Sequence, residues 1–99
     1  MNILLVCAGG LSTSILMKKM KKWADDNDVA LNVEAVAKSG YLQKAEAFDC
    51  ILLGPQISYS LDEVSKNAPI PVASIEPLDY AMGDAEKIIN LARKTINGG

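Results

Sequence analysis

The sequence contains no histidine, which removes the most common general base, the most common metal ligand and any phosphohistidine. Cysteine is also scarce. Two distant cysteines, Cys7 and Cys50, make a poor metal site when no histidine is present. No apolar run approaches the ~18 residues of a membrane-spanning helix. The 10 basic and 12 acidic residues leave no basic excess for nucleic-acid binding. We therefore expect no metal, no cofactor, no membrane span and no nucleic-acid partner.

The composition that remains is that of a small folded protein. Apolar residues make up 49% of the 99 residues and charged residues 22%, which is enough for a real core and argues against disorder. This length predicts one domain over residues 1–99, and we expect a monomer. The apolar run Ile3-Leu4-Leu5-Val6 is too short for the core of a signal peptide, and no basic region precedes it. These features predict a cytoplasmic protein.

Strand-like and helix-like segments alternate four times along the chain. The apolar patterns predict strands over 2–7, 31–37, 50–53 and 71–75, and helices over 12–26, 42–47, 59–67 and 79–96. The first and third strands are apolar throughout, so we expect them at the centre of a parallel sheet, whereas the other two carry polar residues typical of edges. With right-handed connections, the sequence predicts a three-layer α/β sandwich whose four-stranded parallel sheet has the order 2-1-3-4.

That strand order places a switch point at the carboxyl ends of strands one and three, where such sheets bind ligands. Cys7 ends the first strand, two glycines follow, and a helix begins. Backbone N–H groups in such a loop and at a helix amino terminus bind anions, and their dipoles favour a thiolate over a thiol. We therefore predict Cys7 as a nucleophile towards phosphorus. The predicted phosphate-binding residues are Ala8, Gly9, Gly10, Leu11, Ser12, Thr13 and Ser14.

Two interpretations that give these residues a purely structural role are also possible. Cys7 could be a small buried hydrophobe at a strand end, and a glycine-rich turn could simply reverse the chain. Cysteine, paired glycines and three hydroxyls together favour the functional interpretation. Cys50 is predicted as a core residue. It starts a strand whereas Cys7 ends one, an offset of about three residues or ~10 Å, too far for a disulfide.

The loop also distinguishes hydrolysis from transfer. Cysteine, a phosphate loop and a parallel sheet resemble the low-molecular-weight tyrosine phosphatases, which need an arginine six positions after the cysteine. Here that position is Thr13, and the sequence has no Asp-Pro pair to supply an acid for the leaving group. We therefore expect a phosphocysteine that is hydrolysed slowly and transfers its phosphoryl group to another acceptor. A cysteine phosphatase or arsenate-reductase-like protein, and a small phosphate- or nucleotide-binding flavodoxin-like domain, remain alternatives.

The whole chain resembles the IIB component of bacterial sugar phosphotransferase systems of the lactose/cellobiose/chitobiose type. The matching motifs are Cys7-Ala8-Gly9-Gly10-Leu11-Ser12-Thr13-Ser14 and Ile51-Leu52-Leu53-Gly54-Pro55-Gln56-Ile57-Ser58-Tyr59. The resemblance implies that a IIA phosphohistidine protein donates a phosphoryl group to Cys7. It also implies that Cys7 passes the group to a sugar, β-linked or lactose-like, held by a membrane IIC component, with the protein peripheral to the membrane through that partner.

Some residues outside the loop are weaker candidates. Gln56 follows Gly-Pro at the switch point and could contact the phosphate loop or a partner, although a plain turn explains it nearly as well. Tyr59 could line the same edge, or it could be a partly buried residue at a helix start. Lys18 and Lys19 belong to a basic run that is typical of a solvated helix face, although they could help to dock an acidic partner.

Overall fold

The structure, a computed structural model, describes residues 1–7 and 12–98. Its strands are β1 (Asn2–Cys7), β2 (Asn32–Ala37), β3 (Cys50–Leu53) and β4 (Val72–Ser74). Its α-helices are α1 (Ser12–Asp26), α2 (Tyr41–Lys44), α3 (Leu61–Asn67), α4 (Pro77–Met82) and α5 (Ala85–Ile96). Three 3-10 helices, η1 (Lys38–Gly40), η2 (Ala45–Ala47) and η3 (Pro55–Ser60), flank α2 and precede α3. No helix in the described part of the chain is long and apolar enough to cross a membrane.

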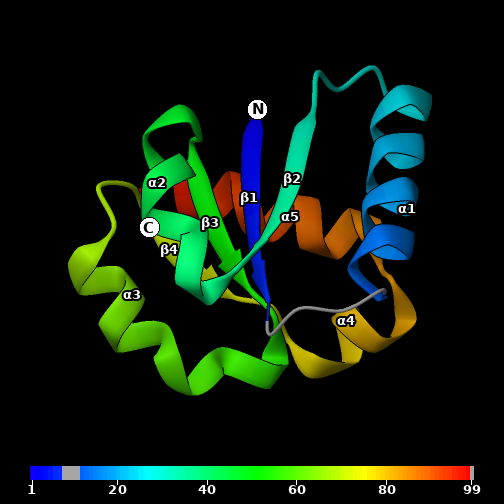
Figure 1. Ribbon diagram of the computed structural model, residues 1–99. Coiled ribbons are helices and arrows are strands. Elements are labelled where there is room, and N and C mark those ends of the chain that lie inside the picture. The colour runs from blue at the N-terminus through cyan, green and yellow to red at the C-terminus, as the bar shows by residue number, and fades with distance from the viewer. Residues whose placement is uncertain (8–11, 99) are drawn as a thin grey trace.

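The four strands form one parallel sheet in the order β2-β1-β3-β4, as predicted (Figure 1). Ile3 lies opposite both Val33 of β2 and Cys50 of β3, so β1 is paired on both sides. The apolar side chains of β1 and β3 are buried on both faces, whereas β2 exposes Asn32 and Glu34 at its edge. The contrast between continuously apolar and mixed strands therefore predicted the strand order correctly.

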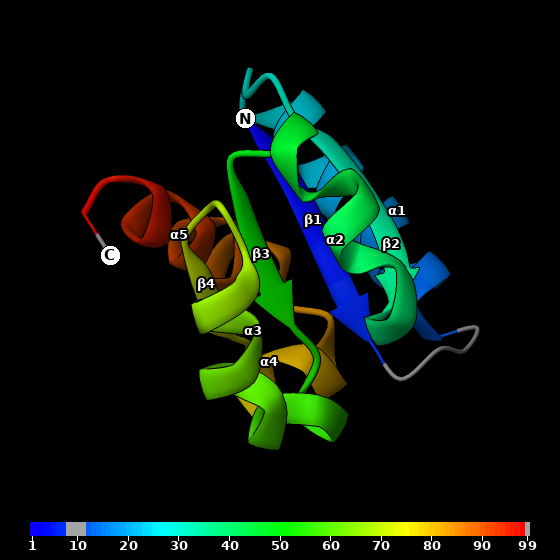
Figure 2. The same cartoon turned by 60° about the vertical axis from the view of Figure 1, so that its left-hand side comes forward.

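Helices cover both faces of the sheet and make it the middle of three layers (Figures 1 and 2). Alternate residues of β1 point to opposite faces, and each set joins a separate core cluster. Ile3, Leu5 and Cys7 pack with residues of α1 and α5. Leu4 and Val6 pack with residues of α2, η2, η3 and α3. Cys7 therefore belongs to the layer that contains α1 and α5.

The predicted final helix, 79–96, is wrong as one element, because the chain forms two helices there. Gly83 adopts a left-handed conformation, with φ of 62°, and ends α4. The Asp84 side chain then accepts a hydrogen bond of 3.2 Å from the backbone N–H of Lys87 and caps α5. The apolar pattern hid this break because its spacing continues across the two residues. As a result, α4 is a separate short helix by the carboxyl end of the sheet (Figure 1), and its Asp79 forms an ion pair of 3.9 Å with Lys87 of α5.

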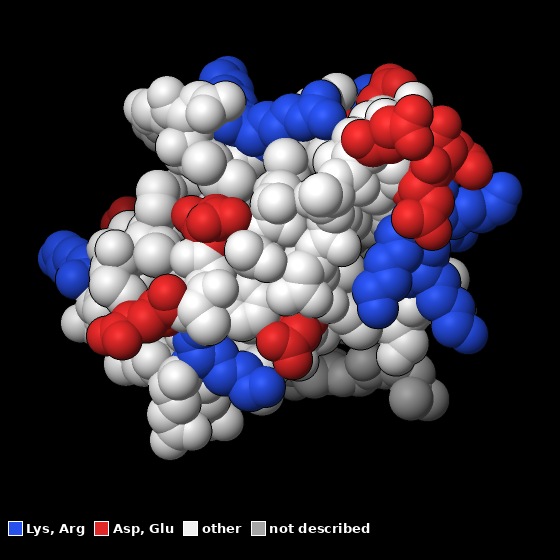
Figure 3. All heavy atoms as spheres, turned by 90° about the horizontal axis from the view of Figure 1, so that it is seen from above, with Lys and Arg blue, Asp and Glu red and all other residues white. Residues whose placement is uncertain are grey.

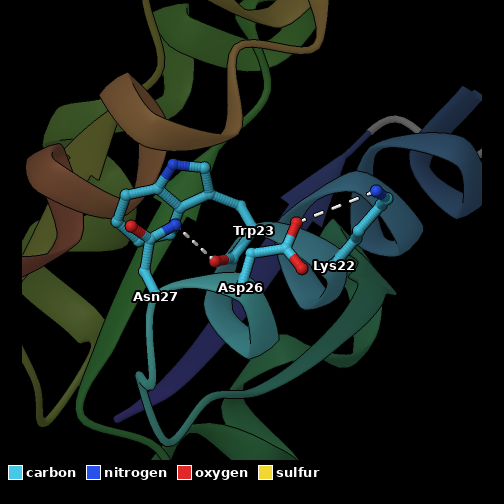
Figure 4. Close-up of polar contacts among 4 residues, drawn as sticks. All are labelled: Lys22, Trp23, Asp26 and Asn27. Atoms are coloured by element: carbon cyan, nitrogen blue, oxygen red, sulfur yellow. Dashed lines mark hydrogen bonds and ion pairs between the residues drawn. The ribbon is translucent and has the colours of Figure 1, made fainter.

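The carboxyl end of α1 is closed by local hydrogen bonds (Figure 4). The Asn27 side-chain amide donates to the carbonyl of Trp23 at 2.8 Å, and Asp28 then turns the chain with φ of 55°. On the exposed side, Lys22 and Asp26 form an ion pair of 3.7 Å one turn apart. Because both side chains are mostly exposed, this pair contributes little stability.

Candidate functional site

Cys7 lies at the carboxyl end of β1, where the sheet meets the predicted phosphate loop. It is the last residue of the strand, opposite Ala37 of β2, and its side chain is 4% exposed. The pairing with β3 continues past the last strand residue, because the Gly54 N–H donates to the carbonyl of Val6 at 2.9 Å. The switch point predicted from the strand order is therefore the place where β1 and β3 end side by side.

Gly54 and Gln56 lie directly beside the thiol. A Cβ atom built on Gly54 would stand 3.2 Å from Cys7 Sγ and 2.8 Å from Gln56 Oε1. Cys7 Sγ and Gln56 Oε1 therefore both lie near the position of this Cβ atom, and the distance between them is at most 3.2 Å plus 2.8 Å. This glycine leaves open a space that any other residue would fill with a side chain. The Gln56 amide and the Cys7 sulfur therefore both lie beside Gly54, and the contact of Gln56 with the phosphate loop or with a partner stays a prediction.

The predicted cradle is described only in part. Ala8, Gly9, Gly10 and Leu11 lie outside the described residues. Ser12, Thr13 and Ser14 form the first turn of α1, so this 15-residue helix begins shortly after the cysteine. Thr13 is buried at 4% exposure and Ser14 is exposed. A helix amino terminus offers unpaired N–H donors and a partial positive charge, which suit a phosphoryl group bound near Cys7.

Other candidates separate into exposed and buried residues. Tyr59 is 81% exposed in η3, so it is not the partly buried helix-start residue that one interpretation expected. Lys18 and Lys19 are both exposed on α1. Both cysteines are free, and Cys50 lies opposite Ile3, four residues before Cys7 and one residue farther than predicted. Burial, together with the charge of Asp49, raises the pKa of the Cys50 thiol to about 12. These features make Cys50 an unreactive core residue.

Sequence reasoning missed the part played by Gly54. In the sequence, Gly54 stands directly after the strand predicted over 50–53 and before a proline. Its importance depends on a contact with Cys7, which is distant along the chain and adjacent across the sheet. The available signal was a glycine at the carboxyl end of the strand expected beside β1. Within residues 1–7 and 12–98, no three acidic or cysteine side chains gather in a way that could hold a metal ion.

Comparison with known proteins identifies the family. The family described as "PTS system, Lactose/Cellobiose specific IIB subunit" matches residues 2–91. The chain belongs to this IIB family. It is 35% identical to the oligo-beta-mannoside-specific EIIB component of Bacillus subtilis (strain 168), over 87% of this chain and 86% of that protein. It is also 35% identical to the cellobiose-specific EIIB component of Lactococcus lactis subsp. lactis (strain IL1403), over 96% of this chain and 95% of that protein.

A solved structure of a IIB component has the same fold. The cellobiose-specific phosphotransferase IIB component protein from Borrelia burgdorferi superimposes with a TM-score of 0.83 at 36% identity. The match covers 98% of this chain and 92% of that one. The resemblance noted from the two loop motifs is confirmed, and the protein is a IIB-type phosphotransferase. Membership of this family sets aside the phosphatase and the nucleotide-binding domain as primary interpretations.

Proposed function

We propose that Cys7 carries a phosphoryl group between two proteins of a sugar phosphotransferase system. The observation that carries this proposal is the position of its sulfur at the end of β1, beside the space that Gly54 leaves open. The helix amino terminus of α1 follows shortly after, with the donors that a phosphoryl group needs. Membership of the IIB family supplies the kind of reaction that these features serve.

The transfer has two steps, and in each step one bond to phosphorus forms while another breaks. In the first, the Cys7 thiolate attacks phosphorus on the phosphohistidine of a IIA donor. An S–P bond forms, the P–N bond breaks, and the imidazole nitrogen keeps the electron pair. In the second, a sugar hydroxyl held by a membrane IIC component attacks the same phosphorus. The S–P bond breaks, the thiolate is restored, and the hydroxyl proton passes to a base on the acceptor side.

The loop from Ala8 to Ser14 binds the phosphoryl group in this scheme. Backbone N–H groups at the start of α1 and the hydroxyls of Ser12, Thr13 and Ser14 supply the donors, because this segment contains neither lysine nor arginine. In a phosphatase, an arginine guanidinium at the position of Thr13 would bind the phosphate oxygens and stabilise the transition state for attack by water. Thr13 cannot do this, so hydrolysis lacks that stabilisation. This chemistry favours a phosphocysteine that persists until an acceptor arrives.

The sugar is a β-linked disaccharide or a lactose-like sugar in this proposal. The two relatives at 35% identity are named for oligo-beta-mannoside and for cellobiose, so identity alone does not choose between sugars. The sugar is selected by the IIC component, which holds it during the second step. Residues 1–99 then act as one phosphocarrier domain and a monomer, in the cytoplasm beside the membrane that contains IIC.

Intact-mass spectrometry after incubation with a phosphorylated IIA donor tests the proposal. The wild-type protein should gain one phosphoryl group, and peptide mapping should place it on Cys7. Cys7→Ser should gain none, whereas Cys50→Ala, a matched change of the buried cysteine, should gain one. An unmodified wild-type protein with a competent donor, or a phosphoryl group that persists in Cys7→Ser, would overturn the assignment. Rapid donor-independent hydrolysis of a generic phosphate ester would instead favour a phosphatase.

A further inference from the structure

The Gln56 amide lies beside the reactive thiol at the carboxyl end of the sheet. The position of a Cβ atom on Gly54 is 2.8 Å from Gln56 Oε1 and 3.2 Å from Cys7 Sγ, so both atoms border the side of this glycine that has no side chain. A phosphoryl group extends two bonds beyond the sulfur, and a hydrogen bond adds about 3 Å between its oxygen and a donor nitrogen. The amide therefore lies within reach of a phosphoryl group on Cys7.

The backbone around Gln56 is fixed, whereas the end of its side chain can turn. The Gly54 N–H donates to the carbonyl of Val6 at 2.9 Å, and the Ile57 N–H donates to the carbonyl of Gly54 at 3.1 Å. Ile57 is 4% exposed and belongs to the core cluster of the α3 layer. Gln56 itself is exposed, and half a rotation about the last bond of a glutamine side chain exchanges its oxygen and its nitrogen. The same backbone can therefore present either an acceptor or a donor to the space beside Cys7.

Gln56 is also the only residue with a nitrogen donor in its side chain within the two loops that follow β1 and β3. These loops are residues 8–14 and 54–60, and neither contains lysine, arginine, histidine or asparagine. The hydroxyls of Ser12 and Thr13 belong to α1, whereas Gln56 follows β3. Gln56 thus adds a donor on the β3 side of the thiol, which the start of α1 does not supply.

The positive charges of the neighbouring strands are engaged or distant. Lys38 directly follows β2, but its ammonium group forms an ion pair of 3.0 Å with Glu63 of α3. Charged side chains of both signs gather around the end of the sheet where the strands begin (Figure 3). That end is one length of β1, ~17 Å, from Cys7, and exposed charges are largely screened over this distance. A neutral N–H donor beside the sulfur therefore matters more than it would next to a free cation.

We propose that Gln56 is a phosphate-binding residue, whose amide turns by half a rotation and donates a hydrogen bond from Nε2 to the phosphoryl group on Cys7. This inference rests on the proposed function. The amide oxygen beside the thiol would repel the phosphoryl oxygens, which carry negative charge, so the amide has to reverse when Cys7 is phosphorylated. A hydrogen bond to a charged oxygen is stronger than one between neutral groups. The bond stabilises the phosphocysteine relative to the free thiol.

Two substitutions of Gln56 test this role through the equilibrium constant for phosphoryl transfer between a IIA donor and Cys7. Gln56→Ala removes the donor, and we expect the equilibrium constant to fall about tenfold. Gln56→Glu keeps the size and the oxygen atoms but loses the N–H donors and adds a negative charge, so it should lower the constant by a further factor of about ten. Gln43→Glu is the matched control, since Gln43 is exposed on α2, and its equilibrium constant should equal that of the wild type.

The side-chain amide resonances give a second measurement that a purely structural role would not change. Gln43 and Gln56 are the two glutamines of the chain. In ¹⁵N-labelled protein, phosphorylation should move the Nε2 protons of Gln56 downfield and slow their exchange with water. The Nε2 protons of Gln43 should keep their chemical shifts.

The outcomes separate this inference from the proposed function. A wild-type equilibrium constant in Gln56→Ala, or amide resonances of Gln56 that phosphorylation leaves in place, would overturn the role of Gln56, although Cys7 would still carry the phosphoryl group. A Gln56→Glu protein that accepts the phosphoryl group as readily as Gln56→Ala would exclude a donor role in the same way. Failure of the wild-type protein to accept a phosphoryl group would overturn the proposed function itself.

Discussion

Replacing Gly54 by alanine tests the geometry around Cys7 most sharply. The added Cβ would stand 3.2 Å from Cys7 Sγ and 2.8 Å from Gln56 Oε1. The Gln56 amide can rotate away, but Cys7 is held at the end of a paired strand and must shift by a few tenths of an ångström. Gly54 has φ of −65° and ψ of 152°, a conformation that alanine adopts without strain. Alanine therefore restricts the unfolded chain, which offsets overpacking of about 1 kcal/mol and leaves stability nearly unchanged.

The effect on transfer should be much larger than the effect on stability. The new methyl group occupies space beside the sulfur and displaces it from the line of attack on phosphorus. Since misplacement by ~1 Å can cost about a hundredfold, we expect a loss of roughly tenfold or more in the rate of Cys7 phosphorylation. Rapid-quench kinetics measure the rate, and urea unfolding measures the free energy of unfolding.

Two controls decide the cause of the loss. Gly40→Ala adds the same methyl group where no atom lies within 4 Å, so this variant should transfer at the wild-type rate. The double variant Gly54→Ala with Gln56→Ala removes the contact with the amide but keeps the contact with the thiol, so it should be slower than Gln56→Ala alone by the same factor that separates Gly54→Ala from the wild type. A Gly54→Ala protein that transfers as fast as the wild type would refute the argument from crowding at the sulfur.

Three further predictions concern separate parts of the structure. Gln56→Ala should slow phosphorylation of Cys7 by about tenfold in the same kinetic assay, because a polar group beside the phosphoryl site is lost, while stability changes by less than ~0.5 kcal/mol. Asp84→Ala removes the acceptor for the Lys87 N–H at 3.2 Å, and calorimetry should show a Tm lower by about 4–8 °C for a loss of ~1 kcal/mol. Burial raises the pKa of Cys50 to about 12 from an ordinary value of 9.0, so the unfolded chain loses this proton first and stability falls as pH rises between the two values. Urea unfolding should show that the stability of the wild type relative to Cys50→Ala falls by about 1.4 kcal/mol from pH 8 to pH 10, whereas a constant difference would contradict the shift.

The arrangement of the strands was predictable because it follows from where apolar residues occur. Residues 3–6 and 50–53 are apolar without interruption, and this pattern is typical of a strand that is covered on both faces. The alternating pattern of 31–37 indicated an edge. The same reasoning separated Cys7 from Cys50 by their positions within strands, and the register confirms that these residues lie far apart along the sheet.

The parts that escaped prediction have two different causes. The break at Gly83 is local, since a glycine that ends α4 is followed by the aspartate that caps α5, but the apolar pattern continues across both residues. Gly54 became part of the site only when the pairing of β1 with β3 placed it against the thiol. The cysteine and its loop were visible in the sequence, but their neighbours across the sheet were not.

A pulse-chase of the phosphoryl group tests the central claim most directly. The protein is first phosphorylated by radiolabelled IIA donor, purified away from that donor, and then mixed with membranes that contain the IIC component and the sugar. If Cys7 is a carrier, the label should leave the protein and appear in sugar phosphate, at a rate well above its release as inorganic phosphate without membranes. Label that stays on the protein, or that reaches water as fast without an acceptor as with one, would contradict the account.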